Sequence, residues 1–163
     1  MKKIVILFII LIIVSCVHNN RQIIDNEYYY NGVEGIDYVI LPYDPITDKW
    51  SVLAFREGTP AGITTIDLEN INELLQSAVE KYNNELKKAW EKNIELSKYN
   101  RQYIAIINEN GEKEVFVNCF RAGVRDYWKN HFVYVSDGGN AYFQVGINLT
   151  TLKIYRFSVN GYA

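Results

Sequence analysis

The chain has 163 residues, of which 48% are hydrophobic and 22% are charged, a length sufficient for one domain with a buried core. Its formal net charge is −2, because 17 Lys and Arg stand against 19 Asp and Glu, and the cationic side chains form no dense cluster. This pattern argues against nucleic acid as a partner, since phosphates call for clustered Lys and Arg.

The first sixteen residues have the layout of a secretory signal. Two lysines precede an unbroken apolar run, Ile4–Val14, which ends at Ser15 and Cys16. These eleven apolar residues would form a helix about 16 Å long, roughly half of the ~30 Å hydrocarbon core, so no permanent spanning helix is expected. We expect residues 1–15 to be removed as a signal peptide.

The segment Ile13-Val14-Ser15-Cys16 resembles the lipobox of bacterial lipoproteins. In that family a diacylglycerol is attached to the cysteine thiol before the peptide bond on its amino side is cut. The resemblance implies that Cys16 is lipidated and becomes the first residue of a protein anchored to a bacterial membrane, at its periplasmic or surface face. An ordinary signal peptide with a chance cysteine near its end is the alternative.

A polar tether is predicted between the signal and the folded part. Residues 16–34 show no sustained hydrophobic period, and residues 17–32 would reach about 50 Å if fully extended. Three adjacent tyrosines, Tyr28–Tyr30, are costly to leave in water, so at least one should dock on the domain. Residues 35–163 are then expected to form a single α+β domain.

The domain is predicted to begin with a β-hairpin or strand pair. Two β-rich runs, Ile36–Leu41 and Trp50–Phe55, flank a segment that contains prolines and aspartates.

A long helix follows in the prediction. Thr64-Thr65-Ile66-Asp67 supplies capping hydroxyls and an acid for the first turn, and apolar residues then recur every three or four positions. The helix is expected to run to about Lys98. A break near Asn83-Asn84 is the alternative, because Asn is a poor helix former.

From residue 101 onward the hydrophobic period changes to two, which predicts a five-stranded antiparallel meander. Asn110-Gly111 separates the first two strands and indicates a type I′ hairpin. The later strands are predicted at His131–Val135, Ala141–Leu149 and Lys153–Val159. Alternate residues of Ala141–Leu149 are apolar, so the helix should cover that face of a curved sheet.

A long helix packed on such a meander is similar to the cystatin-like and NTF2-like folds. The terminal run "DGGNAYFQVGINL", followed by "SVNGYA", is also similar to small, mostly uncharacterised lipoproteins of the Bacteroidota. These resemblances imply a fold and a cell-envelope location, and they carry no chemistry.

One pair of residues could support catalysis. Cys119 ends one predicted strand and His131 begins the next, so in a symmetric pair they would face each other about 5 Å apart, and the imidazole would lower the thiol pKa. The favoured alternative is that Cys119 is a small buried hydrophobic residue, in register with Val115 and Val117.

No metal or other cofactor is expected. If Cys16 carries lipid, only Cys119 remains, so an internal disulfide cannot form, and the common zinc ligand clusters are missing from the sequence. The turn Asp137-Gly138-Gly139-Asn140 could hold a cation, yet it lacks the ligand spacing of a calcium loop.

The predicted binding surface is aromatic and lies on the sheet face that the helix leaves uncovered, near Tyr127, Trp128 and Tyr142. We favour a non-catalytic module of the cell envelope that binds an envelope protein, a peptide or a glycan. A cysteine hydrolase that uses Cys119 and His131 is the alternative, but one cysteine and two histidines give an exported enzyme few catalytic side chains.

Overall fold

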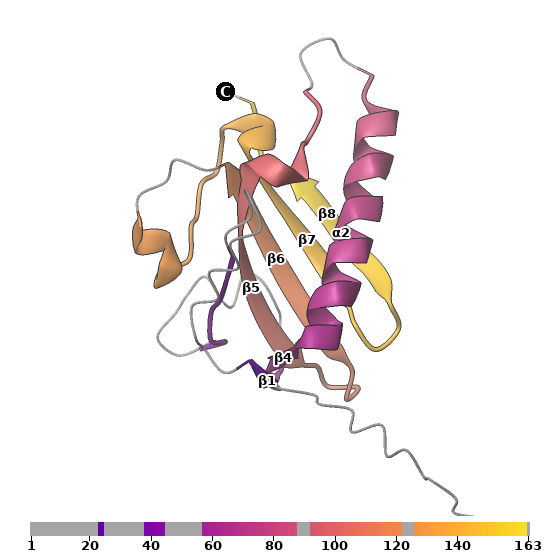
Figure 1. Ribbon diagram of the computed structural model, residues 1–163, viewed down its shortest axis with the longest axis vertical. Helices are drawn as coiled ribbons and strands as arrows, with labels where there is room; N and C mark the ends of the chain where they lie inside the picture. Colours follow the sequence, from indigo (N-terminus) through magenta and orange to yellow (C-terminus); the bar gives the residue numbers. More distant parts are fainter. Residues whose placement is uncertain (1–22, 25–37, 45–56, 88–91, 122–125, 163) are drawn as a thin grey trace, which may run out of the picture.

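One long helix lies along a face of an open β-sheet (Figure 1). The computed structural model describes residues 23–24, 38–44, 57–87, 92–121 and 126–162. Its elements in chain order are β1 (Ile23–Ile24), β2 (Tyr38–Ile40), β3 (Thr59–Pro60), β4 (Ile63–Thr64), helix α2 (Thr65–Glu85), the 3-10 helix η1 (Leu96–Lys98), β5 (Tyr99–Ile107), β6 (Lys113–Arg121), the 3-10 helices η2 (Asp126–Lys129) and η3 (Gly139–Ala141), β7 (Tyr142–Asn148) and β8 (Lys153–Val159).

The main sheet has the strand order β2-β5-β6-β7-β8. Neighbouring strands from β5 to β8 are antiparallel, whereas β2 runs parallel to β5, and β3 pairs with the far end of β5. This architecture confirms the predicted α+β class, with a helix on an antiparallel sheet and a strand before it. The second run of the predicted hairpin, Trp50–Phe55, lies outside the described residues.

The predicted start of α2 is confirmed, and its predicted end at Lys98 is wrong. Thr64 is the N-cap, with its hydroxyl 3.2 Å from the Asp67 N–H, while the Thr64 N–H donates to the Asp67 carboxylate at 2.7 Å. The helix ends at Glu85, close to the alternative break. There the Asn83 side chain bonds both backbone groups of Ile94, at 2.8 and 2.9 Å, so the returning chain replaces further helix.

The β5–β6 hairpin lies where it was predicted, but its turn is not type I′. The Asn108 N–H donates to the Glu112 carbonyl at 2.9 Å, which leaves a three-residue loop closed by Gly111 at φ 76°. A type I′ turn would need positive φ at Asn110 as well. The Asn108 side chain explains the wider loop, because its Oδ1 accepts the N–H groups of Asn110 and Glu112, both at 3.0 Å.

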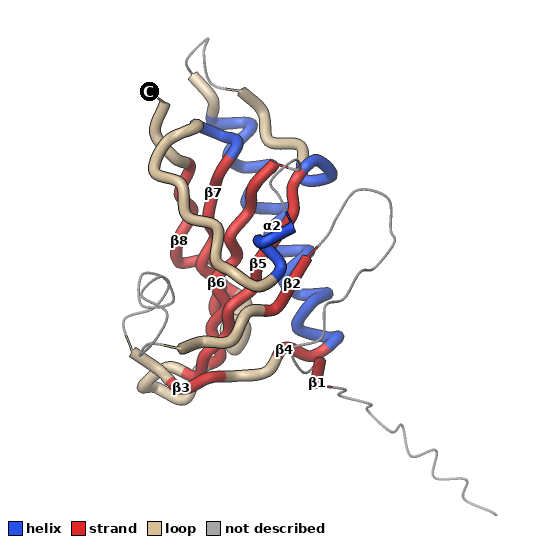
Figure 2. The backbone as a smooth tube through the Cα atoms, turned by 90° about the vertical axis from the view of Figure 1, so that its left-hand side faces the viewer, coloured by secondary structure: helices blue, strands red, loops and turns tan. Residues whose placement is uncertain are grey.

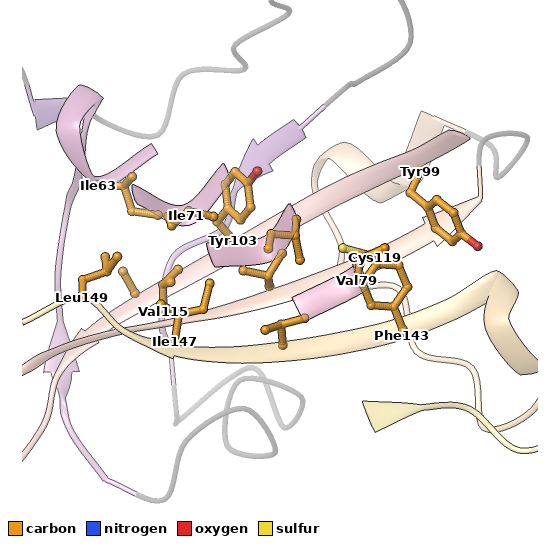
Figure 3. Close-up of a cluster of buried hydrophobic side chains, with 14 of the residues drawn as sticks. Ile63, Ile71, Val79, Tyr99, Tyr103, Val115, Cys119, Phe143, Ile147 and Leu149 are labelled. Carbon is orange, nitrogen blue, oxygen red and sulfur yellow. The ribbon is translucent and has the colours of Figure 1, made fainter. Parts of the chain in front are cut away.

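The main core lies between α2 and the sheet (Figure 3). Alternate residues of β7 point into it, as predicted, and they meet the apolar side of the helix. Its members from α2 and β7 are Ile71, Leu75, Val79, Phe143, Val145 and Ile147. Each such buried side chain contributes roughly 1.5–3 kcal/mol relative to an exposed one, so this interface fixes the helix on the sheet.

The other face of the sheet is also partly covered, which the sequence did not predict. Residues 127–136, here called the strap, cross this face as an irregular segment with η2 at one end (Figure 2). Trp128 and Val133 of the strap pack on Phe116 and Phe120 in a second apolar cluster, to which Val39 of β2 also belongs.

The predicted third strand of the meander, His131–Val135, is therefore wrong. β6 pairs directly with β7, and the strap lies over the sheet instead of between these strands. Its backbone is bonded by side chains of the sheet: the Val133 N–H donates to Gln102 Oε1 at 2.9 Å, and Asn118 Nδ2 donates to the Val133 carbonyl at 2.8 Å. These bonds replace the ladder that a fifth meander strand would need.

Part of the predicted tether belongs to the folded structure. Ile23 and Ile24 form β1, which pairs antiparallel with β4 just before α2. Cys16 and Tyr28–Tyr30 lie outside the described residues. Within the part of the chain that the structure describes, no helix combines the length and the apolar character needed to cross a bilayer.

Candidate functional site

The structure separates the two residues of the proposed catalytic pair. Cys119 is fully buried in the main core, beside Val79 and Phe143 (Figure 3), and its partners across the ladders are Arg101 and Phe143. His131 is exposed on the strap, on the opposite side of the sheet. The expectation that they face each other is wrong, and Cys119 is the buried hydrophobic residue that its register indicated.

The environment of Cys119 also opposes nucleophilic chemistry. Burial raises the pKa of its thiol to about 12, although the neighbouring Arg101 acts in the opposite direction. A thiolate is the reactive form, so almost none is available near neutral pH.

The three aromatic residues predicted to bind a ligand do not form one exposed surface. Tyr127 is 52% exposed, but Trp128 is only 3% exposed, and its ring packs edge-on against Phe120 at a centroid distance of 5.5 Å. Tyr142 is half-buried against the second cluster. Trp128 is therefore a core residue that holds the strap, and a flat ligand cannot stack on it without displacing that core.

A cleft of about 440 Å³ opens beside the strap on the same face of the sheet. Its volume lies in the range of small-molecule sites. The floor comes from β6, β7 and β8, and the strap forms a wall. The lining residues are Phe116, Asn118, Phe132, Val133, Tyr134, Val135, Ser136, Gln144, Arg156, Ser158, Val159, Asn160 and Gly161.

The strand register arranges the floor in two rows. In one row Asn118, Gln144 and Ser158 lie side by side across β6, β7 and β8. In the next row Phe116 is opposite Gly146, which is opposite Arg156. A polar row thus runs beside a row with an aromatic ring at one end and a cation at the other.

Hydrogen bonding in the polar row decreases from the strap toward the cleft. Gln102, which continues this row on β5, donates from Nε2 to the carbonyls of Trp128 and His131, at 2.6 and 2.7 Å. Gln144 Nε2 donates to Asn160 Oδ1 at 3.2 Å and makes a long contact of 3.5 Å with Asn118 Oδ1. No described residue donates to Gln144 Oε1 or bonds the Ser158 hydroxyl, so both can bind a ligand.

Arg156 supplies the positive charge of the cleft. Its guanidinium carbon lies 5.6 Å from the centroid of the Phe116 ring, in a cation-π contact. The intervening Gly146 has no side chain, and a Cβ there would collide with the Tyr155 ring, so glycine at this position leaves room for that ring. Neither of the ion pairs found among the described residues involves Arg156.

The walls of the cleft are fixed at two points. Val133 is held by Gln102 and Asn118, and the far end of the strap is held by Asn160, whose Nδ2 donates to the carbonyls of Val135 and Asp137. The Asn160 N–H donates to the Tyr142 carbonyl at 3.1 Å. Such a site is largely formed before a ligand arrives, which lowers the entropic cost of binding.

The turn that could have held a cation is used by the fold. The Asn140 amide donates to the carbonyls of Lys92 and Asn93, at 2.9 and 3.1 Å. Among the residues with described positions, no group of three His, Cys, Asp or Glu side chains could hold a metal ion.

One sequence signal could have located the cleft. Gln102, Asn118 and Gln144 are amides at interior positions of three adjacent strands, and all three lie on the face opposite the helix. Comparison of the chain with protein families, curated proteins and solved structures finds no match to any of them.

Proposed function

We propose that the chain is a cell-envelope lipoprotein, anchored through Cys16, whose domain binds a ligand in the cleft without catalysing a reaction. The observation that carries this proposal is the cleft itself, with fixed walls, an unpaired cation and polar groups that lack partners among the described residues. The lipobox resemblance supports the anchor.

The position of β1 supports a short connection to the membrane. Six residues, 17–22, separate Cys16 from Ile23, and the seven residue steps between them span at most about 25 Å when extended. In Figure 1, β1 and β4 lie at the end of the molecule opposite the C-terminus. Asn160 and Gly161, which line the cleft, are close to the C-terminus in the sequence. A domain anchored through β1 would hold its β1–β4 end close to the lipid. The Asn160–Gly161 end of the cleft would then lie away from the lipid.

The cysteine hydrolase gains no support. The thiol of Cys119 is buried under α2, while His131 belongs to the strap on the other face of the sheet. A general base must reach the group that it deprotonates, and these two side chains are separated by the sheet.

Ligand mapping tests the proposal. Residues 16–163 with Cys16→Ser, which correspond to the proposed mature chain without its lipid, would be titrated with N-acyl amino acids, short peptides and N-acetyl sugars while amide NMR shifts are recorded. We expect shifts at cleft residues, abolished by Ser158→Trp or Ser136→Trp, which fill the cleft from opposite sides, and retained in Ser77→Trp on the exposed side of α2. If no compound shifts the amide resonances of the cleft residues, the proposal is wrong. It is also wrong if these shifts persist in both Ser158→Trp and Ser136→Trp.

A further inference from the structure

The positive charge of the cleft has no ion-pair partner within the part of the chain that the structure describes. Arg156 lies on the Phe116 ring, and the Phe132 ring of the strap lies 6.1 Å from Phe116, so the guanidinium stands beside a pair of aromatic side chains. Among the described residues, no side chain accepts a hydrogen bond from the Arg156 guanidinium or forms an ion pair with it, so its N–H groups can bind a ligand. The N–H groups of a guanidinium are the part that binds a carboxylate in a bidentate manner.

The nearby anionic and phenolic groups are engaged elsewhere. The Glu114 carboxylate accepts a bond of 2.7 Å from Asn108 and interacts with the Tyr155 hydroxyl. Burial, together with Glu114, raises the pKa of Tyr155, so this phenol stays neutral near pH 7. Arg156 therefore meets no charged competitor from Tyr155.

An acceptor for an N–H group lies close to this cation. Gln144 is two positions from Gly146 on the same face of β7, and Gly146 is the cross-strand partner of Arg156. Diagonal neighbours of this kind are about 7–8 Å apart, a separation that a small acylated amino acid can bridge. The Ser158 hydroxyl, directly opposite Gln144, adds a donor for the acyl carbonyl.

We propose, on the basis of the proposed binding function, that the cleft recognises a carboxylate with a neighbouring acylamido group. Arg156 binds the carboxylate, the Gln144 Oε1 accepts the amide N–H, and the Ser158 hydroxyl donates to the acyl oxygen. The free C-terminus of a peptide and an N-acetylated acidic sugar both carry this chemistry.

Two matched pairs of probes test this inference. N-acetylglycine and N-acetylglycinamide differ only in the carboxylate, and they represent a peptide end. N-acetylmuramic acid and N-acetylglucosamine represent the sugar. Each would be titrated into residues 16–163 with Cys16→Ser, with the cleft resonances as the readout. We expect the acid of at least one pair to bind about tenfold or more tightly than its neutral partner.

Arg156→Gln should reduce this preference to within about twofold. Arg121→Gln is the matched control, because Arg121 is also an exposed arginine over an aromatic ring, 5.9 Å from the centroid of Tyr99, but lies outside the cleft. It should keep the full preference.

The outcomes separate the two proposals. Equal binding of acid and neutral probe in the cleft, or a preference that survives Arg156→Gln, overturns the carboxylate inference and leaves the binding function standing. Probes that shift no cleft resonance also overturn it, and the wider ligand mapping then decides the binding function. If only one acid binds, that result identifies the peptide or the sugar as the source.

Discussion

Asn118 donates a hydrogen bond from Nδ2 to Gln102 Oε1 at 3.0 Å, across β5 and β6 and beneath the strap. Both side chains are buried, and together they satisfy the backbone of Val133 on each side. The strap is thereby fixed to the sheet by side chains, and its edge becomes the wall of the cleft. The stability of this contact should consequently control the shape of the binding site.

Replacing Asn118 by Ala should destabilise the domain and loosen the strap. The substitution leaves the Val133 carbonyl without its donor in a buried position, which costs about 1–3 kcal/mol. Urea unfolding measures the loss, and hydrogen exchange at Val133 reports the loosening. Asn84→Ala on the exposed side of α2 is the control and should change stability by less than about 0.5 kcal/mol. Equal stability of the two variants would show that the hydrogen bond from Asn118 to Val133 does not stabilise the domain.

Trp128→Ala should lower the stability of the domain. It should not remove a direct contact with a ligand. Its side chain is 3% exposed and packs on Phe120, and truncation of such a side chain costs about 3–5 kcal/mol. Thermal unfolding of Trp128→Ala and Tyr127→Ala measures the difference, because Tyr127 is 52% exposed and its loss should have little effect. A Trp128→Ala domain as stable as the wild type would contradict the core assignment.

The thiol of Cys119 should react slowly. With a pKa of about 12, it has almost no thiolate at pH 8, and burial under α2 blocks access. In the Cys16→Ser chain, labelling by a thiol reagent should follow the rate of opening of the domain and accelerate in urea. Rapid labelling of the folded domain that depends on His131 would restore the hydrolase hypothesis.

The Asp67 carboxylate should make stability depend on acid pH. Burial favours its neutral form, but hydrogen bonds from Lys113 and Thr64 outweigh that effect and lower the pKa below 3.8. Because the folded state holds the anion, its contribution is present above the unfolded pKa and is lost as pH falls through the lower folded value.

Asp67→Asn should therefore cost about 1–2 kcal/mol at pH 7 and progressively less below pH ~3.8. Urea unfolding between pH 2 and 7 measures this difference. Glu69→Gln is the control in the same turn of α2, where the side chain is exposed. If the difference in unfolding free energy between wild type and Asp67→Asn stayed constant from pH 2 to 7, it would contradict the lowered pKa of Asp67.

Local patterns predicted the elements that depend on nearby residues. The hydroxyl and acid at Thr64 and Asp67 gave the correct helix start, and the alternation along β7 gave the face that α2 covers. The helix end was missed because it depends on Asn83 bonding a segment eleven residues away. Hydrophobic periodicity and helix propensity do not predict contacts between residues this far apart in the sequence.

The cleft was missed for a related reason. His131–Val135 has the composition of a strand, but the amides of Gln102 and Asn118, from two other strands, bond its backbone and hold it across the sheet. Once the strap lies there, Trp128 becomes a core residue. The predicted aromatic surface assumed a bare face of the sheet, so it could not anticipate a cleft lined by Gln144 and Arg156.

The mass of the mature amino-terminal peptide tests most directly whether the chain works as a lipid-anchored envelope protein. We predict that this peptide begins at Cys16, carries a thioether-linked diacylglycerol, and is found in the membrane fraction. The Cys16→Ser chain should carry no lipid and, because the lipid is attached before the cut, should keep residues 1–15. An unmodified thiol at Cys16, or a mature chain that still contains residues 1–15, would contradict the account.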